Sequence, residues 1–239
     1  MVKVVVVGFG GRMGGEIARL ISLENDIELV GGVEAPSHPL IGKPAGSGAV
    51  VSELKDLIEM TDVVVDFSVP EAVGKNLLLC ADKNKPFITG VTGLSDKELK
   101  ELKNAGKRIP VVYAPNFSLG VAVLTKISQE TAQLLGPDYD IHLIETHHKR
   151  KRDAPSGTAK MLVERIKERI GERGIEIFSI RTGDVVGEHR LIFGGPGERL
   201  ELIHRAETRA AFAFGVIRAI RWVVSQPPGF YSMADILKD

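Results

Sequence analysis

Six consecutive basic side chains, His147 to Arg152, stand directly before a segment that is typical of a helix N-terminus. The whole stretch, residues 145–159, reads E-T-H-H-K-R-K-R-D-A-P-S-G-T-A. Ser156, Gly157 and Thr158 would offer backbone N–H groups, to which carboxylates bind readily. The combination predicts a site that holds a small dianion beside groups able to transfer protons.

A basic run taken alone is more often a solvated surface, a nucleic-acid patch or an import signal. The charge balance argues against a general polyanion binder, because the 239 residues include 31 Lys plus Arg and 31 Asp plus Glu. The run is also interrupted by residues 153–158. We therefore expect a local site and no nucleic-acid partner.

The N-terminus predicts a dinucleotide-binding loop. Val2 to Val7 indicates a buried parallel strand, which leads into Gly8-Phe9-Gly10-Gly11-Arg12-Met13-Gly14 and then a helix. Glycines at such a junction let the backbone approach a pyrophosphate, which the helix N-terminus stabilises. Because the spacing is G-x-x-G-x-x-G and not G-x-G-x-x-G, a merely tight turn stays an alternative.

The second predicted strand, Ile27 to Val33, ends at Glu34. An acid at this position binds the adenosine ribose hydroxyls in dinucleotide folds, although a simple polar strand end is also possible. Ala35 follows, where an arginine would accommodate a 2′-phosphate. We expect NADH to be accepted well, and NADPH if Arg12 or Lys43 substitutes.

Three further loops follow predicted strands of the first half, which alternate with helices. Strands over residues 62–67, 86–89 and 109–113 end at Phe67-Ser68, Gly90-Val91-Thr92 and Ala114-Pro115-Asn116-Phe117. Open α/β sheets bind ligands at this carboxyl edge, so the loops together predict a nicotinamide crevice. Ser95 and Glu98 form a capping box that starts another helix.

After Phe117 the pattern changes. We expect a helix over 119–135, a strand over 139–146, a helix from the basic motif to about 173, and strands over 175–181, 185–193 and 199–205. A helix over 208–225 and a helical turn over 233–237 close the chain. The fold class predicted is α/β: a Rossmann-like doubly wound parallel sheet (1–118 and 208–239) with an inserted α+β substrate and oligomerisation domain (119–207).

Several classes of protein are not expected from the composition. Cys80 lies in an apolar run and is read as a core residue, so no disulfide forms within the chain. No stretch resembles a signal peptide or approaches the ~20 apolar residues of a membrane span, which predicts a cytoplasmic location without membrane contact. No H-E-x-x-H or paired Cys occurs, so no metal site is expected.

Five motifs together resemble the dihydrodipicolinate reductase family, and they cover the chain almost end to end. They are G-F-G-G-R-M-G at 8–14, F-S-V-P at 67–70, G-V-T-G at 90–93, A-P-N-F-S-L-G-V at 114–121 and the segment 145–159. The last is highly specific, whereas many dehydrogenases share the glycine loop. The resemblance implies reduction of 4-hydroxy-tetrahydrodipicolinate with NADH or NADPH, in lysine and diaminopimelate biosynthesis, by a homotetramer.

Residue roles follow from the resemblance position by position. It implies that Gly8 to Met13, Glu34, Gly90 to Thr92 and Ala114 to Phe117 contact the dinucleotide, with Phe67 on the same edge. His147 and Lys151 would be the catalytic pair, and His148, Gly157 and Thr158 would bind substrate. Ala35, where some relatives place arginine, puts the cofactor preference in doubt; Val91 in place of threonine is expected to alter little.

The implied reaction adds a hydride to a cyclic imine, and the resulting enamine needs a proton. Lys151, a cation among other cations, is expected to donate it, with His147 as an acid or a polarising group. Both His147 and His148 reach one pocket only if the strand breaks there. Arg150 and Arg152 are expected to be surface residues or subunit contacts and not substrate ligands. His142 and His189 are read as structural, and the role of His204 stays open.

Two competing hypotheses remain at this point. One is another oxidoreductase on the same scaffold, such as an imine-reducing amino-acid dehydrogenase, which would not need a ring dicarboxylate. The other is a non-catalytic protein that senses NADH or binds nucleic acid through the basic run.

Overall fold

The computed structural model describes residues 1–238, which form two compact units. Among the described residues, unit 1 comprises 1–117 and 212–238, and unit 2 comprises Ser118–Ala211. Each unit has its own sheet and its own buried apolar cluster. The large parallel sheet and the separate second sheet confirm the predicted α/β fold class.

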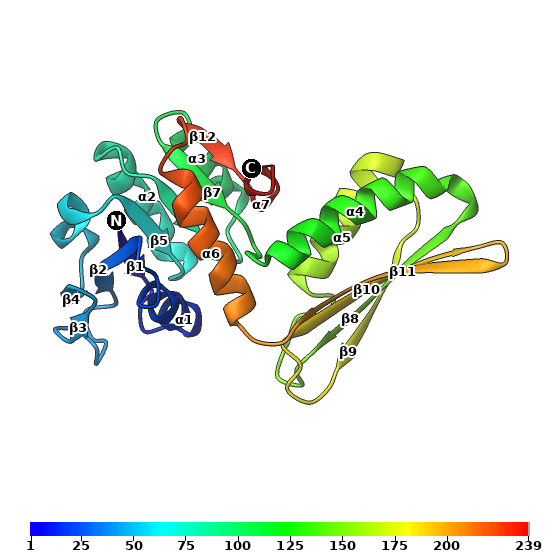
Figure 1. The fold of residues 1–239 in the computed structure, drawn as a ribbon, viewed down its shortest axis with the longest axis horizontal. Coiled ribbons are helices and arrows are strands. Elements are labelled where there is room, and N and C mark those ends of the chain that lie inside the picture. Colours follow the sequence, from blue (N-terminus) through cyan, green and yellow to red (C-terminus); the bar gives the residue numbers. More distant parts are fainter. Residues whose placement is uncertain (239) are drawn as a thin grey trace. The chain divides into compact units, whose positions relative to one another are not determined.

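Unit 1 is built on an eight-stranded sheet in the order β12-β7-β6-β5-β1-β2-β4-β3, parallel except between β3 and β4 (Figure 1). The strands are β1 (Val2–Val7), β2 (Ile27–Val33), β3 (Pro44–Ala45), β4 (Gly48–Val51), β5 (Val63–Asp66), β6 (Phe87–Thr89), β7 (Pro110–Tyr113) and β12 (Gly229–Tyr231). The helices are α1 (Arg12–Ile21), α2 (Pro70–Asp82), α3 (Asp96–Ala105), α6 (Ala210–Val223) and α7 (Met233–Ile236).

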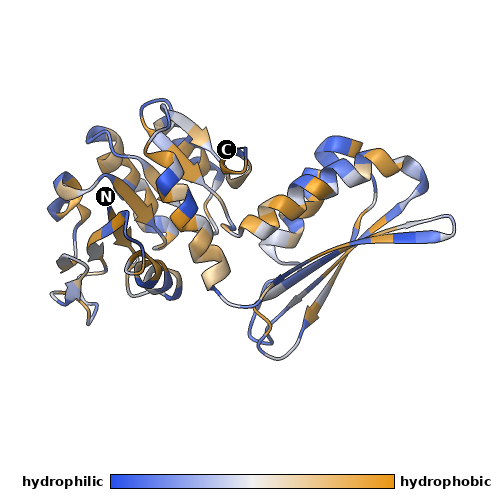
Figure 2. Cartoon of the chain, viewed as in Figure 1, coloured by the Kyte–Doolittle hydropathy of each residue, from blue (hydrophilic) through white to orange (hydrophobic). Residues whose placement is uncertain are grey.

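The core of unit 1 follows from its strand sequences. The valines at 4–7 of β1 and 63–65 of β5 are almost completely buried, which is expected of parallel strands covered on both faces. Figure 2 shows the sheet of unit 1 mainly in the hydrophobic colour. Cys80 is buried in this core, as predicted. The predicted capping box starts α3: Glu98 N donates to Ser95 Oγ at 3.4 Å, and Ser95 N donates to Glu98 Oε2 at 2.6 Å.

Unit 2 is a four-stranded mixed sheet in the order β11-β10-β8-β9, with α4 (Leu119–Leu135) and α5 (Gly157–Ile170) along one face (Figure 1). Its strands are β8 (Asp140–His147), β9 (Glu176–Arg181), β10 (Gly187–Gly195) and β11 (Glu198–Ala206). Strand β10 is antiparallel to β8 and β11, while β8 and β9 are parallel. Leu143, Leu191 and Phe193 are fully buried beneath the two helices.

Some predicted boundaries are wrong. Helix α5 ends at Ile170 and not near Arg173, because Gly171 adopts a left-handed φ of 78° that terminates the helix. The β3–β4 hairpin and β12 were not predicted. Strand β12 pairs with β7, so the last part of the described chain returns to the sheet of unit 1.

Among the described residues, no helix combines the length and the apolar character needed to cross a bilayer.

Two adjacent glycines of α1 provide a matched test of this packing. A Cβ on Gly14 would lie 2.0 Å from Gly8 O, whereas a Cβ on Gly15 would have Phe9 O as its nearest neighbour at 3.8 Å. We expect Gly14→Ala to lower the free energy of unfolding by about 2 kcal/mol, because backbone atoms cannot move aside. Gly15→Ala should be neutral or raise it by up to about 1 kcal/mol, since alanine favours helix. Denaturant titration measures both, and equal stability of the variants would contradict the close approach.

Candidate active site

The residues predicted to contact a dinucleotide lie along one edge of the sheet of unit 1. This is the carboxyl edge, which five parallel strands share. Gly8 to Met13 follow β1, Glu34 follows β2, Phe67 follows β5, Gly90 to Thr92 follow β6, and Ala114 to Phe117 follow β7. The strand order reverses between β1 and β5, and ligands bind at such a switch point in open α/β sheets.

The loops after β1 and β5 touch at this switch point. Gly8 has φ of +75°, and a Cβ there would lie 2.6 Å from Phe67 O. A Cβ on Gly90 would lie 2.2 Å from the Phe67 ring, whose centroid is 5.5 Å from that of Phe117. The two glycines therefore allow four of the predicted residues to form one contiguous cluster.

The glycine loop and Glu34 fit a dinucleotide. Glu34 Oε1 accepts a hydrogen bond from Gly10 N at 2.7 Å, and Oε2 accepts one from Ala35 N at 3.2 Å. Helix α1 begins after Gly11, which has no side chain to cap the first turn. An uncapped helix start carries unsatisfied N–H groups and a positive dipole end, both of which favour a phosphate.

Asp66 supports this edge and was missed by the sequence analysis. It is fully buried at the end of β5, where it accepts from Ser68 N at 2.9 Å, Ser68 Oγ at 2.5 Å and Asn76 Nδ2 at 2.8 Å. Burial raises the pKa of Asp66, although these hydrogen bonds act in the opposite direction. The carboxyl group thus fixes the turn that carries Phe67. An acid that ends an apolar strand was the signal available in the sequence.

The basic motif begins where β8 ends. Glu145 and His147 point to the face of the sheet that α4 and α5 cover, together with Leu143, because alternate residues share a face. The strand ends at His147, and His148 lies outside it. This is the strand break that the sequence analysis required if both histidines are to serve one site.

Glu145 lies at the centre of a buried ionic cluster. Its exposed fraction is 0%, its Oε2 makes a short contact with His147 Nδ1, and its Oε1 accepts from Arg181 Nη2 at 2.6 Å and from Ser156 N at 3.3 Å. Burial would raise the pKa of Glu145, but hydrogen bonds from Arg181, Ser179 and His147 outweigh it and lower the pKa to about 2. The sequence analysis singled out neither Glu145 nor Arg181.

Two further histidines lie on the same face of the sheet. The His189 ring meets that of His147 edge-on at 5.3 Å, and its Nε2 lies 3.5 Å from Ser156 Oγ. Burial lowers the pKa of His189 to about 3, so the ring is neutral. This buried ring packs against that of His147. His204 Nε2 lies 3.1 Å from Ser118 Oγ, the N-cap of α4.

Lys151 has an acidic neighbour in addition to the cations that the sequence places beside it. Its Nζ lies 2.8 Å from Asp153 Oδ1, in a tight loop that brings the two side chains together. Arg150 and Arg152 are exposed, as predicted, and Arg150 pairs with Asp184 at 2.7 Å.

His148 Nδ1 is buried and has no hydrogen-bond partner within residues 1–238.

Helix α5 begins within the segment that the sequence predicts as a helix N-terminus. Ser156 is the N-cap, and its Oγ accepts from Ala159 N at 3.2 Å. Gly157 is the first helical residue and is exposed, and a Cβ there would meet nothing within 4 Å. Space in front of the helix N-terminus is therefore open at Gly157.

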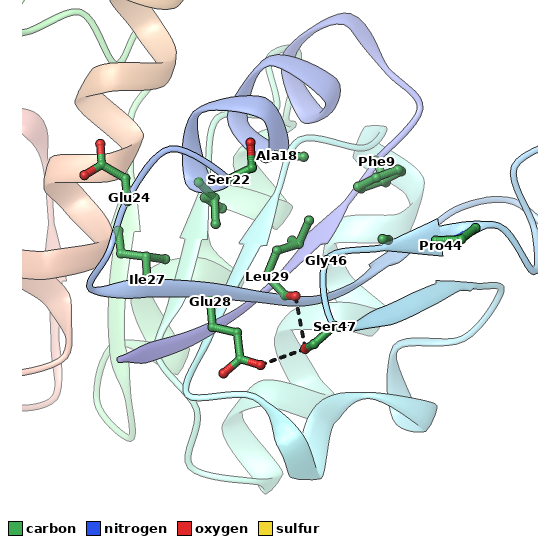
Figure 3. Close-up of a pocket in the computed structure, with 12 residues that line it drawn as sticks. Phe9, Ala18, Ser22, Glu24, Ile27, Glu28, Leu29, Pro44, Gly46 and Ser47 are labelled. Carbon is green, nitrogen blue, oxygen red and sulfur yellow. Dashed lines mark hydrogen bonds between the residues drawn. The ribbon is translucent and has the colours of Figure 1, made fainter.

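A separate pocket of about 360 Å³ lies between α1, the start of β2 and the β3–β4 hairpin (Figure 3). It shares only Phe9 with the predicted cofactor residues, and its lining is mainly apolar. Ser47 Oγ donates to Glu28 Oε1 at 2.7 Å, so these polar groups satisfy each other. Within residues 1–238, no cluster of His, Cys, Asp or Glu is suited to hold a metal ion.

Comparison with known proteins covers both units. The family models for the N-terminus and the C-terminus of dihydrodipicolinate reductase match residues 2–117 and 120–237. The 4-hydroxy-tetrahydrodipicolinate reductase of Syntrophus aciditrophicus is 41% identical over 264 residues, with 99% of this chain and 98% of that protein covered. The enzyme of the same name from Anaeromyxobacter sp. is 42% identical over 262 residues, with the same coverage.

Solved structures share the fold of this chain. Dipicolinate-bound dihydrodipicolinate reductase from Paenisporosarcina sp. TG-14 superposes with a TM-score of 0.84 and 26% identity, covering 97% of each chain. A probable dehydrogenase from Thermotoga maritima, 15% identical with a TM-score of 0.68, covers 98% of this chain and 92% of its own and shares the fold.

Proposed function

The chain belongs to the dihydrodipicolinate reductase family, and we propose that it reduces 4-hydroxy-tetrahydrodipicolinate to tetrahydrodipicolinate with NADH or NADPH. This reaction is a step of lysine and diaminopimelate biosynthesis. One structural observation supports the proposal most strongly. His147, which contacts the buried carboxylate of Glu145, lies in the same short segment as the N-terminus of α5, which is open at Gly157. The first is suited to proton transfer and the second to a carboxylate.

The carboxyl edge of unit 1 would hold the cofactor, which supplies the hydride when it is bound. The glycine loop, Gly8 to Met13, and the uncapped start of α1 would bind the pyrophosphate. Glu34 would bind the adenosine ribose hydroxyls, in place of its present bond to Gly10 N. Phe67, Gly90 to Thr92 and Ala114 to Phe117 would surround the nicotinamide.

The start of α5 would hold a carboxylate of the substrate. Gly157 and Thr158 would contribute backbone N–H groups, and His148 a ring N–H. Lys151 supplies a cation in the loop that leads to this helix. A ring that bears two carboxylates matches such a set of donors.

Reduction then requires one proton for each hydride. The hydroxylated substrate loses water to form a conjugated imine, and hydride addition at a ring carbon leaves an enamine that must be protonated. Lys151 carries a transferable proton and would supply it. His147 would assist as a second acid or by polarising the ring.

A homotetramer is the proposed assembly. One face of the sheet of unit 2 carries Phe178, Ile180 and Ile203, which are 50%, 47% and 42% exposed. Exposed apolar side chains gathered on one sheet face are typical of an interface.

The basic segment is proposed to serve a small-molecule site and not a polyanion surface. Two of its cations are already paired with carboxylates, Arg150 with Asp184 and Lys151 with Asp153, which supports this choice.

A coupled assay tests the function directly. The aldol product of pyruvate and aspartate semialdehyde is offered with either reduced cofactor, and the fall in nicotinamide absorbance is followed. We expect turnover with both, NADH being at least comparable to NADPH, because Glu34 suits the ribose diol and Ala35 offers no charge to a 2′-phosphate. A reaction without aspartate semialdehyde is the control. A preference of more than about tenfold for NADPH, or roughly 1.4 kcal/mol, would contradict the role of Glu34.

The role of Lys151 is tested against its neighbour Lys149. Lys151→Met is nearly isosteric but removes the transferable proton, so kcat should fall by about 10²-fold, the usual scale for a lost general acid. NADH affinity, measured by fluorescence titration, should stay within a few fold. Lys149→Met, in the same loop but exposed, should leave both quantities unchanged. Equal kcat values for the two variants would remove Lys151 from the mechanism.

The carboxylate site is tested with pyridine-2,6-dicarboxylate, which has a planar ring and both carboxylates but is not reduced productively. Gly157→Val should weaken its binding at least about tenfold, or roughly 1.4 kcal/mol, because the side chain obstructs the helix N-terminus. Gly174→Val is the matched control, since a Cβ meets nothing within 4 Å at either position. Titration calorimetry measures both. If the two variants bind the inhibitor equally well, the dianion sits elsewhere.

A further inference from the structure

Besides the Ser179 hydroxyl, three groups contact the buried carboxylate of Glu145, and two of them can only donate hydrogen bonds. Arg181 Nη2 and Ser156 N both donate to Oε1, at 2.6 and 3.3 Å. Neither group can accept a hydrogen bond. His147 Nδ1 contacts the other oxygen, Oε2. Each oxygen of Glu145 thus has a defined partner.

This arrangement determines which nitrogen of His147 carries the proton. A carboxylate with a low pKa is ionised and only accepts, so the neutral imidazole must present Nδ1–H to Oε2. Nε2 is then left as the nitrogen that can exchange a proton. Gly187 leaves space beside it, because a Cβ at that position would lie 3.2 Å from Nε2.

We propose that Glu145 is a positioning residue that fixes the tautomer and the orientation of His147 and joins that ring to the start of α5. The inference rests on the proposed function, in which His147 assists proton transfer. The same carboxylate accepts from Ser156 N, the N-cap residue of α5. One side chain therefore sets both the ring and the helix start of the carboxylate site.

Of the described groups that face His147, Glu145 is the one that carries a negative charge. The others are Arg181 of β9, His189 of β10 and Lys151 of the following loop. Burial lowers the pKa of His147, Lys151 and Arg181 lower it further, and Glu145 acts in the opposite direction. Loss of the carboxylate charge should therefore lower the pKa of His147 further and disfavour its protonated form.

Glu145→Gln separates positioning from a merely structural role. The glutamine must turn its oxygen to Arg181 and Ser156, because both only donate. Its NH₂ group then faces His147 Nδ1, which must become an acceptor, and the proton of the neutral ring moves to Nε2. The isosteric substitution thus reverses the tautomer of His147 while it keeps the bonds to β9 and α5.

The decisive measurement is the ¹⁵N NMR spectrum of protein labelled at histidine, with His147→Gln used to assign the signal. We expect Nδ1–H in the unmodified protein and Nε2–H in Glu145→Gln. In the coupled assay, Glu145→Gln should lower kcat by about 10²-fold, the scale of general acid–base catalysis. KM should stay within about threefold, or ~0.7 kcal/mol, because the start of α5 is still held. Glu168→Gln, an equal change of charge on the exposed face of α5, should change neither.

The outcomes distinguish this inference from the proposed function. An Nε2–H tautomer in the unmodified protein overturns the positioning role, and this measurement does not depend on activity. Unchanged kcat and tautomer in a folded Glu145→Gln protein also overturn it, while the proposed function stands. Absence of turnover in the unmodified protein, with the Nδ1–H tautomer observed, would instead refute the proposed function.

Discussion

A carboxylate that is fully buried must be matched by positive charge and hydrogen-bond donors, because leaving it desolvated and unpaired costs several kcal/mol. In unit 2 that requirement is met from three directions: Arg181 at the end of β9, His147 on β8 itself, and Ser156 N at the start of α5. Arg181 Nη2 also donates to Asp153 O at 2.6 Å, which holds the loop before α5. The hydrogen bonds and ion pairs of this one buried carboxylate thus bring together the ends of β8 and β9 and the start of α5.

Unit 1 depends on a different constraint, the close approach of uncharged backbone. Gly8 meets the loop after β5 on one side and α1 on the other, where Gly14 lies against Gly8 O. No side chain fits at these contacts, so the helix start stays next to the strand end. The resulting edge presents backbone dipoles, which suit a diphosphate, while the charges that suit a dicarboxylate are concentrated in unit 2. This division matches the proposed function, in which backbone N–H groups of unit 1 would bind the cofactor and charged side chains of unit 2 would bind the substrate.

The sequence predicts local features well and long-range pairings poorly. The valine run of β1, the capping box at Ser95 and the helix over 119–135 are set by neighbouring residues, and the structure confirms them. The β3–β4 hairpin and β12 have two to four residues each, too few for a recognisable period. The cluster at His147 could be predicted only if β9 and β10 were known to flank β8, because this pairing places Arg181 and His189 beside His147. No spacing in the sequence reveals that pairing.

The residue pattern of strand β8 shows how apolar packing fixes the position of the ionic cluster. Along its covered face, Ile141 and Leu143 pack under α4 and α5, and Glu145 and His147 follow at the same two-residue period. Strand β10 repeats the change in character, since Phe193 and Leu191 pair with the apolar half of β8 and His189 pairs with Glu145. The apolar half fixes the register of the sheet, and a slip by one residue would move every side chain to the other face. Buried ion pairs often add little net stability, so packing elsewhere on the same strands must supply the stability, and the ionic end then supplies geometry at the site.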